Sequence, residues 1–279
     1  MSPWVLTLGA WAVMAALMHG LWLRQRITHN AGIVDVAWSF GTGLLGVAFA
    51  ALASGDPARR ALIGAMAFIW GARLGGHLLA RMRHESEDGR YRVLRERWGD
   101  GVQRFLLIFF QVQALWAVLF ALPMLAAALN PAPGLRPLDL TAGAWWLMAM
   151  AGESLADAQL ARFRADRANA GAVCRRGLWR YSRHPNYFFE WLQWFAYVAL
   201  AWGGPTGWFV VACCGPVVMF VFLTRLTGVP MTEAQALRSR GEAYRAYQRS
   251  TSAFFPWFPR EEGPTAPASD TLSSGDRLP

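Results

Sequence analysis

Residues 105–129 read FLLIFFQVQALWAVLFALPMLAAAL, an apolar stretch without a single charged side chain. A helix needs about 20 mostly apolar residues to cross the hydrocarbon core of a membrane, and this stretch is longer than that. It contains Pro123, which membrane helices tolerate when neighbouring helices satisfy the freed carbonyl group. The stretch therefore predicts a transmembrane helix.

The composition of the whole chain agrees with a membrane protein. Hydrophobic residues occupy 54% of the 279 positions and charged residues only 16%, whereas soluble domains carry about 25% charged residues. Seven stretches are candidate spans, namely residues 3–23, 33–53, 61–80, 105–129, 140–160, 187–202 and 207–224. The sequence predicts an all-α polytopic membrane protein of about seven helices.

All 27 basic residues are arginines, which excludes chemistry that needs a lysine amine. They concentrate in two connections, 81–104 and 162–183, and positively charged connections stay in the cytoplasm. We therefore expect the N-terminus outside and the C-terminal segment inside. The net charge of +9 is compatible with nucleic acid, anionic lipid or a phosphorylated cofactor. Its position between spans favours the last two, and we expect no nucleic-acid partner.

The segments outside the spans indicate one membrane domain, residues 1–260. Residues 233–249 have the pattern of an amphipathic helix at the membrane surface, and FFPWFP at 254–259 is typical of an aromatic anchor. Residues 261–279 lack periodicity and predict a disordered tail. The three cysteines have no spacing typical of zinc sites, so we expect no metal.

Five ionisable residues lie inside predicted spans: Asp35, Arg73, Glu153, Asp157 and Glu190. Each costs roughly 2.5–3.5 kcal/mol at the centre of a membrane helix, so such residues indicate function. Glu153 and Asp157 are four residues apart and share one helix face. Two like charges on one face need a cation or a hydroxyl-rich ligand.

Asp35 admits two interpretations. It is one helical turn from Trp38 and shares a face with it, as expected of two residues that contact a substrate. It also lies near the predicted cytoplasmic boundary, where a carboxylate commonly stabilises a helix start.

The densest polar segment is GLWRYSRHPNY at 177–187, followed by Glu190. Pro185 is suited to the first turn of a helix, whose amide groups can receive a phosphate. Arginines suit phosphates and carboxylates suit ribose hydroxyls. The pattern favours a phosphorylated nucleotide as the ligand, although any single arginine is also explained by topology and lipid headgroups.

The run RHPNY at 183–187 with Glu190, together with the closing segment 241–259, resembles the C-terminal half of membrane steroid 5α-reductases, in their bacterial branch. The resemblance extends over residues 35–259 and is strongest in the second half. Similar segments occur in sterol reductases and in isoprenylcysteine and phospholipid methyltransferases.

The resemblance implies a seven-span fold that holds NADPH in a cavity open to the cytoplasm of a bacterial inner membrane. By motif, Asn186 and Glu190 match cofactor contacts, and Asp35 matches the acid that holds the substrate carbonyl. Glu153 and Asp157 match a family Asn-x-x-x-Asp pattern with Glu in place of Asn. The family's third-helix tyrosine has no counterpart here, which leaves the indole N–H of Trp70 or another hydroxyl for its role.

The resulting hypothesis is NADPH-dependent reduction of the Δ4 double bond of a 3-oxosteroid or similar lipophilic enone by a monomer. Asp35 and Glu190 are the expected catalytic residues, with a protonated Asp35 donating to the enolate oxygen. Substrate contacts are expected from Asp35, Trp38 and Trp70. Cofactor contacts are expected from Arg83, Arg90, Glu153, Asp157, Arg164, Arg180, Arg183, His184, Asn186, Tyr187, Glu190, Tyr244 and Tyr247.

Two other classes remain open. A membrane methyltransferase that uses S-adenosylmethionine shares the RHPNY region and could use Glu233. A transporter or scaffold is the third class, but a transporter would be expected to show inverted repeats and broken helices.

Overall fold

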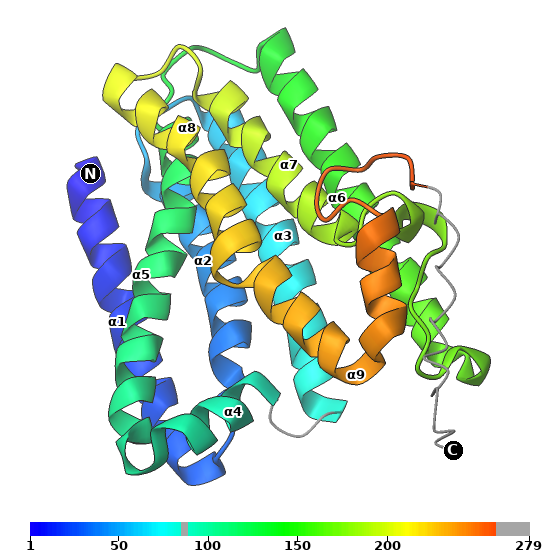
Figure 1. The fold of residues 1–279 in the computed structure, drawn as a ribbon. Helices are drawn as coiled ribbons and strands as arrows, with labels where there is room; N and C mark the ends of the chain where they lie inside the picture. Colours follow the sequence, from blue (N-terminus) through cyan, green and yellow to red (C-terminus); the bar gives the residue numbers. More distant parts are fainter. Residues whose placement is uncertain (85–88, 261–279) are drawn as a thin grey trace, which may run out of the picture.

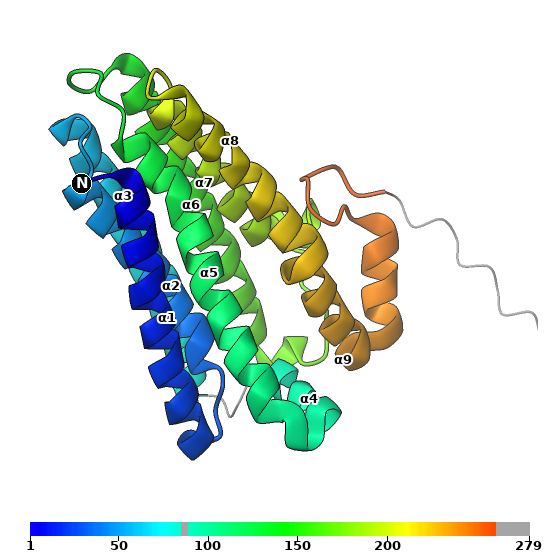
Figure 2. The ribbon, with the colours of Figure 1, turned by 90° about the vertical axis from the view of Figure 1, so that its left-hand side faces the viewer.

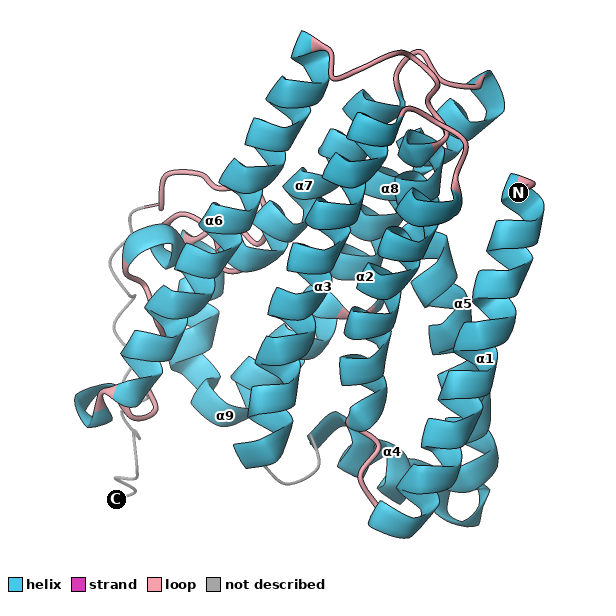
Figure 3. Cartoon of the chain, turned by 180° about the vertical axis from the view of Figure 1, so that it is seen from behind, coloured by secondary structure: helices cyan, strands magenta, loops and turns pink. Residues whose placement is uncertain are grey.

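The structure is a computed structural model that describes residues 1–84 and 89–260. Within these ranges every regular element is a helix and no strand occurs (Figure 3). The all-α prediction is therefore confirmed for this part of the chain. The tail 261–279 and the side chains of Arg83 and Arg90, for which phosphate contacts are expected, lie outside the described residues.

The helices run up and down through one bundle (Figure 1). In chain order they are α1 Pro3–Thr28, α2 Ile33–Leu52, α3 Pro57–His84, α4 Gly89–Trp98, α5 Val102–Ala128, α6 Pro137–Ala165, α7 Pro185–Ala201, α8 Thr206–Val221 and α9 Gly228–Ser250. Short turns of other helix types follow α4, α6 and α8 or precede α7, at Gly99–Gly101, Arg167–Asn169, Phe222–Leu226 and Gly177–Arg180.

Five helical stretches are long and apolar enough to cross a membrane: Pro3–Thr28, Ile33–Leu52, Pro57–Ala80, Leu94–Ala128 and Thr206–Ser250. The chain is therefore a membrane protein by length and composition. The predicted spans 140–160 and 187–202 form α6 and α7, which are not among these five stretches. Length and charge explain the difference. α7 has only 17 residues, and α6 carries Asp139, Glu153 and Asp157.

Glycines allow α2 and α3 to approach closely. A Cβ atom added at Gly43 would lie 2.8 Å from the Cα of Gly71 and 2.9 Å from the carbonyl oxygen of Ala67. Small residues at such crossings let membrane helices pack backbone to backbone. This contact fixes where α3, and with it Trp70 and Arg73, stands in the bundle.

Substitution of Gly43 by alanine is expected to destabilise the bundle by about 1–3 kcal/mol, because two backbones must move apart. The measurement is the thermal unfolding midpoint of the purified protein in detergent. Gly76→Ala is the matched control, because a Cβ at this α3 position meets nothing within 4 Å. Equal midpoints for the two variants would contradict the close-packing interpretation.

The end of the bundle away from α4 is held by a buried ion pair. Arg59 of α3 and Asp139 of α6 are both fully buried, with Nη2 of Arg59 2.7 Å from Oδ2 of Asp139. The same guanidinium donates to the carbonyl oxygens of Asn130, Ala132 and Gly134. Burial raises the pKa of Asp139, but hydrogen bonds from Arg59 and Arg136 outweigh it and hold that pKa well below its usual range.

Arg59→Met is expected to cost about 3 kcal/mol, because it leaves Asp139 with Arg136 as its remaining cation and removes the side-chain donor to the carbonyl oxygens of Ala132 and Gly134. Chemical unfolding of the detergent-solubilised protein measures the loss. Arg60→Met serves as the control, since the Arg60 guanidinium donates to the carbonyl oxygens of Ala50 and Ala51 near the surface and pairs with no acid among the described residues. A loss for Arg59→Met no larger than for Arg60→Met would show that the pair is dispensable.

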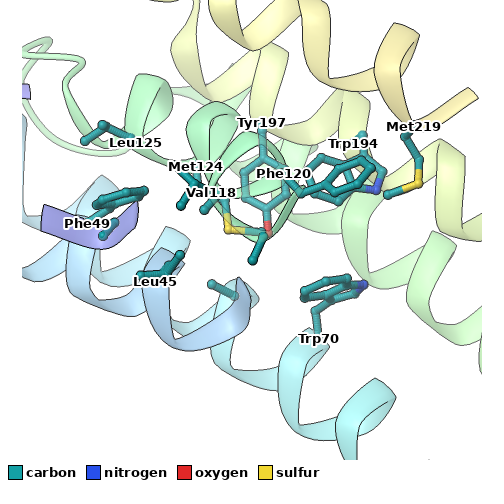
Figure 4. Packing of buried hydrophobic residues seen from close by; sticks show 14 of the residues in the cluster. Leu45, Phe49, Trp70, Val118, Phe120, Met124, Leu125, Trp194, Tyr197 and Met219 are labelled. Atoms are coloured by element: carbon teal, nitrogen blue, oxygen red, sulfur yellow. The ribbon is translucent and has the colours of Figure 1, made fainter. Parts of the chain in front are cut away.

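Aromatic rings fill the centre of the bundle. Figure 4 shows Phe120 of α5 beside Trp194 and Tyr197 of α7, with Trp70 of α3 facing them. The ring centroids of Trp70 and Trp194 are 6.1 Å apart and nearly perpendicular. Because these rings are almost fully buried, they hold the polar residues on α3 and α7 in fixed positions.

The chain changes direction after α8. A π-helical turn at Phe222–Leu226 leads into α9, which bends at Gly241 with a φ of 50°. Figures 1 and 2 show the second half of α9 running back beside the start of α7. The helix predicted at 233–249 thus exists, but it begins earlier and is broken where glycine alone adopts the required backbone at little cost.

Candidate functional site

A polar cluster lies between α3, α6 and α7, and Arg73 is at its centre. The Arg73 guanidinium forms an ion pair with Glu153, and its Nη1 atom is 3.1 Å from Oδ2 of Asp157. The side chain of Glu153 is 7% exposed and that of Asp157 is 25% exposed. We call Trp70, Arg73, Glu153, Asp157, Asn186, Glu190, Gln193 and Trp194 the Arg73 cluster.

α7 completes this cluster. Asn186 donates from Nδ2 to Oδ1 of Asp157 over 3.1 Å. Glu190 accepts hydrogen bonds from the indole N–H groups of Trp70, at 3.0 Å, and Trp194, at 3.2 Å. Gln193 donates to Oε2 of Glu190 over 2.7 Å. The carboxylate of Glu190 is therefore buried and held by three donors.

The local sequence explains why these side chains converge. Glu153 and Asp157 are one helical turn apart on α6, and Asn186 and Glu190 have the same spacing on α7. Side chains at this spacing project from one face of a helix. The polar face of α6 therefore meets Arg73 of α3, and the polar face of α7 contacts Asp157 through Asn186 and Trp70 through Glu190. The structure brings together Glu153, Asp157, Asn186 and Glu190 as expected for one site.

Several buried oxygens of the cluster have no donor. Within the described residues, Oε2 of Glu153, Oδ1 of Asn186 and Oε1 of Gln193 make no hydrogen bond. Buried acceptors normally find partners, because an unpaired one costs roughly 1–3 kcal/mol. Nε and Nη2 of Arg73 are likewise without a hydrogen-bond partner among the described residues, so the cluster holds both unpaired acceptors and unpaired donors.

A second network joins the start of α7 to α9, with Glu233 at its centre. Oε1 of Glu233 lies 2.7 Å from Nε of Arg183 and 3.2 Å from Nε2 of His184. Gln248 donates to its other oxygen over 2.8 Å. Although burial raises the pKa of Glu233, hydrogen bonds from His184 and Arg183 lower it to about 2. Burial lowers the pKa of His184.

The predicted cofactor residues Arg183, His184, Tyr187, Tyr244 and Tyr247 are thus engaged with α9 or the connection before α7. Tyr187 shares a hydrogen bond with Thr232 over 3.1 Å. The Tyr247 hydroxyl donates to the carbonyl oxygens of Trp179 and Ser182. These five side chains therefore lie around the Glu233 network. They make none of the described contacts of Arg73.

Asp35, in the first turn of α2, has a partner that the sequence does not suggest. The hydroxyl of Tyr91, on α4, donates to Oδ1 of Asp35 over 3.0 Å. Tyr91 is 2% exposed although it lies in an arginine-rich connection. Tyr91 could not be predicted as a site residue from its polar segment. It reaches Asp35 because α4 folds against the bundle.

Trp38 connects Asp35 to the Arg73 cluster. Its ring centroid is 6.1 Å from that of Trp70 in an edge-to-face arrangement. Trp38, one helical turn after Asp35 on α2, therefore contacts Trp70. The N–H group of Trp70 in turn donates to Glu190.

Two predicted phosphate ligands lie away from these residues. Arg164 is in the last turn of α6, and the guanidinium of Arg180 lies over the Tyr181 ring at 6.0 Å. Between the end of α6 and the following connection is a pocket of about 290 Å³ that the sequence did not indicate. Its lining residues are Gln159, Arg162, Phe163, Asp166, Asn169, Cys174, Arg176 and Gly177.

Comparison with known proteins assigns the chain to a family. Residues 21–251 match the family described as "Protein of unknown function (DUF1295)". The chain belongs to this family. It is also 35% identical over 99 residues to the uncharacterized protein C594.04c of Schizosaccharomyces pombe. That match covers 34% of this chain and 27% of the yeast protein. No solved structure matches the chain.

The Glu233 network predicts a loss of stability in acid. The folded-state pKa of His184 is lowered by burial, so below about 6.5 the unfolded chain binds more protons at this residue. Stability from Glu233 is present above its ordinary pKa of 4.5 and is lost as the pH falls toward about 2. We expect the thermal midpoint to fall as the pH decreases from 7 to 5.

His184→Gln should reduce this fall between pH 7 and pH 5, because it removes the titrating imidazole. His29→Gln is the control, since His29 is exposed at the end of α1. Identical pH profiles for the native protein and His184→Gln would contradict the assignment.

Proposed function

We propose that this protein is a membrane-embedded NADPH-dependent reductase that acts on the Δ4 double bond of a 3-oxosteroid or similar enone. The observation that carries the proposal is one connected cluster, in which Glu153 and Asp157 pair with Arg73, Asn186 donates to Asp157, and Glu190 is held by Trp70 of the same helix as Arg73. The resemblance of residues 183–190 to membrane steroid 5α-reductases supports the same activity.

The proposal includes the full topology. α6 and α7 would cross a bacterial inner membrane together with the five apolar stretches, giving seven spans with the N-terminus outside. Support comes from the antiparallel packing of α6 and α7 in the bundle (Figure 1). The arginine-rich connections would then face the cytoplasm, where NADPH is available.

The unpaired oxygens of the Arg73 cluster fit the donors of a nicotinamide nucleoside. Oε2 of Glu153, Oδ1 of Asn186 and Oε1 of Gln193 are acceptors, and the carboxamide and ribose hydroxyls of NADPH offer N–H and O–H groups. When bound, NADPH supplies the hydride. The residues of the cluster would orient the nicotinamide end, and arginines at the cytoplasmic side would hold the phosphates.

Asp35 and Tyr91 are suited to the carbonyl end of an enone. Hydride addition at the β-carbon moves negative charge onto the carbonyl oxygen, which a positioned donor stabilises. The Tyr91 hydroxyl, which gives its single hydrogen to Asp35 over 3.0 Å, would become such a donor by exchanging Asp35 for the carbonyl oxygen. The rings of Trp38 and Trp70 give an apolar surface between this donor and Glu190. A proton added at the α-carbon completes the reduction.

Purified protein incubated with NADPH or with S-adenosylmethionine distinguishes the reductase from the methyltransferase. A ligand that binds the folded state at 100 times its Kd stabilises it by about 2.7 kcal/mol. We expect NADPH to raise the unfolding midpoint and S-adenosylmethionine to leave it unchanged. Stabilisation by the methyl donor alone would defeat the reductase proposal.

Variants of two acids separate binding from turnover. Glu190→Ala should abolish stabilisation by NADPH, because the carboxylate organises Trp70, Gln193 and Trp194. Asp35→Ala should preserve the Kd for NADPH and lower turnover of an enone by about 10²–10³-fold. Isothermal titration and NADPH consumption measure the two effects. Equal loss of both properties in both variants would indicate misfolding and remove the assigned roles.

A further inference from the structure

The pocket at the end of α6 lies on a different face of that helix from the Arg73 cluster. Gln159, Arg162 and Phe163 line it from α6, and residues three and four apart project from the same side of a helix. Glu153, which shares its helix face with Asp157, lies nine residues before Arg162, or about two and a half turns of helix. The two acids therefore point away from the pocket. A ligand held there would occupy a second site.

The wall of the pocket that faces α6 is fixed by the chain itself. The backbone N–H of Leu178 donates to Oε1 of Gln159 over 2.9 Å, and the indole N–H of Trp179 donates to the carbonyl oxygen of Ala156 over 2.9 Å. Gly177 has a φ of 58°, and a Cβ atom there would lie 2.5 Å from the Gln159 side chain. Glycine adopts this backbone at little cost. The cavity of about 290 Å³ is therefore preformed.

Two arginines from different segments line this cavity. Arg162 comes from α6, and Arg176 comes from the connection before α7. Both residues are exposed, and within residues 1–84 and 89–260 neither guanidinium forms an ion pair or a hydrogen bond. In contrast, Oε1 of Gln159 and Nδ2 of Asn169 are engaged with the backbone. Guanidinium groups are planar donors that match the oxygens of a phosphate. The pocket therefore offers two unpaired donor groups to an anion.

The other lining groups indicate what accompanies that anion. Phe163 and the buried Cys174 provide an apolar surface. The carboxylate of Asp166 also lines the pocket, and its Oδ1 accepts the backbone N–H of Ala168 over 2.9 Å. A carboxylate repels a bare anion but accepts hydrogen bonds from hydroxyl groups. These surroundings suit a phosphate ester that carries hydroxyl groups beside the phosphate.

We propose that this pocket, which we call the α6-end pocket, binds a polyol phosphate. The inference goes beyond the proposed reductase activity and does not depend on it. Figure 1 shows the end of α6 at the edge of the bundle, where a ligand can approach from outside. The phosphate can come from a lipid headgroup, as in phosphatidylglycerol, or from a small soluble ester. A phosphate joined to glycerol is the chemistry that both sources share.

Two probes with the same headgroup distinguish these sources. Dihexanoyl phosphatidylglycerol carries its acyl chains, and glycerophosphoglycerol is the same headgroup without them. Isothermal titration of the full chain in a nonionic detergent measures the Kd of each probe. Binding of the acylated probe alone identifies a lipid site, whereas binding of both identifies a site for the soluble ester. Both results support a polyol phosphate site.

Variants of the two arginines assign this binding to the pocket. Arg162→Gln and Arg176→Gln should each raise the Kd by about 10–100-fold, because each removes charge-assisted hydrogen bonds. Arg167→Gln is the matched control. It makes the same change of charge in the neighbouring turn, at an exposed residue outside the lining of the pocket, and it should leave the Kd unchanged.

Cys174 provides a second measurement that needs no change at the arginines. The chain has three cysteines, so replacing Cys213 and Cys214 by alanine leaves Cys174 as the single thiol. A bound probe should cover this thiol and slow its reaction with a maleimide, by roughly tenfold at ten times the Kd. An unchanged rate with the probe bound would place the binding elsewhere and overturn the proposal.

The remaining outcomes separate this inference from the reductase. Binding of neither probe, or equal Kd values for the two pocket variants and Arg167→Gln, overturns the α6-end pocket and leaves the proposed function standing. Loss of stabilisation by NADPH in folded pocket variants would make the pocket part of the cofactor site and overturn a second site. A protein that binds a probe in the pocket but does not bind NADPH overturns the reductase and leaves this inference standing.

Discussion

The ion pairing of Arg73 with Glu153 and Asp157 is the constraint on which the rest of the site depends. A guanidinium inside an apolar bundle is tolerated only when acidic groups meet it, and those groups must come from neighbouring helices. α6 provides both acids, and α7 is joined to them through Asn186. The pairing therefore fixes three helices relative to one another, in the region where the aromatic core is also densest.

The Glu233 network extends this arrangement to the end of the chain. Arg183 and His184, just before or at the start of α7, share one carboxylate of α9. The chain after α9 then returns to the same place, where Arg183 donates its backbone N–H to the carbonyl oxygen of Ser252 over 2.8 Å. The RHPNY segment thus serves two clusters at once, since Asn186 donates to Asp157 of the Arg73 cluster while Arg183 and His184 contact α9.

The site was predictable to the extent that its residues repeat at helical spacing. Glu153 with Asp157, and Asn186 with Glu190, could be assigned to common faces because four residues make about one helical turn. Tyr91 could not be found in this way, because it belongs to a short polar helix with no such pattern. The partner of Arg59 could not be found in this way either, because the structure buries Arg59 against Asp139, a residue of another helix 80 positions away.

Apolar length and charge distribution determined by themselves that this chain is helical and lies in a membrane, because the hydrocarbon core admits little else. They also located the polar residues within single helices. Only the tertiary structure decided which of those residues meet: Arg73 with α6, Trp70 with Glu190, and Tyr91 with Asp35. Such partners are set by the crossing of helices distant in sequence, as at Gly43 and Gly71, and periodicity within one helix carries no information about them.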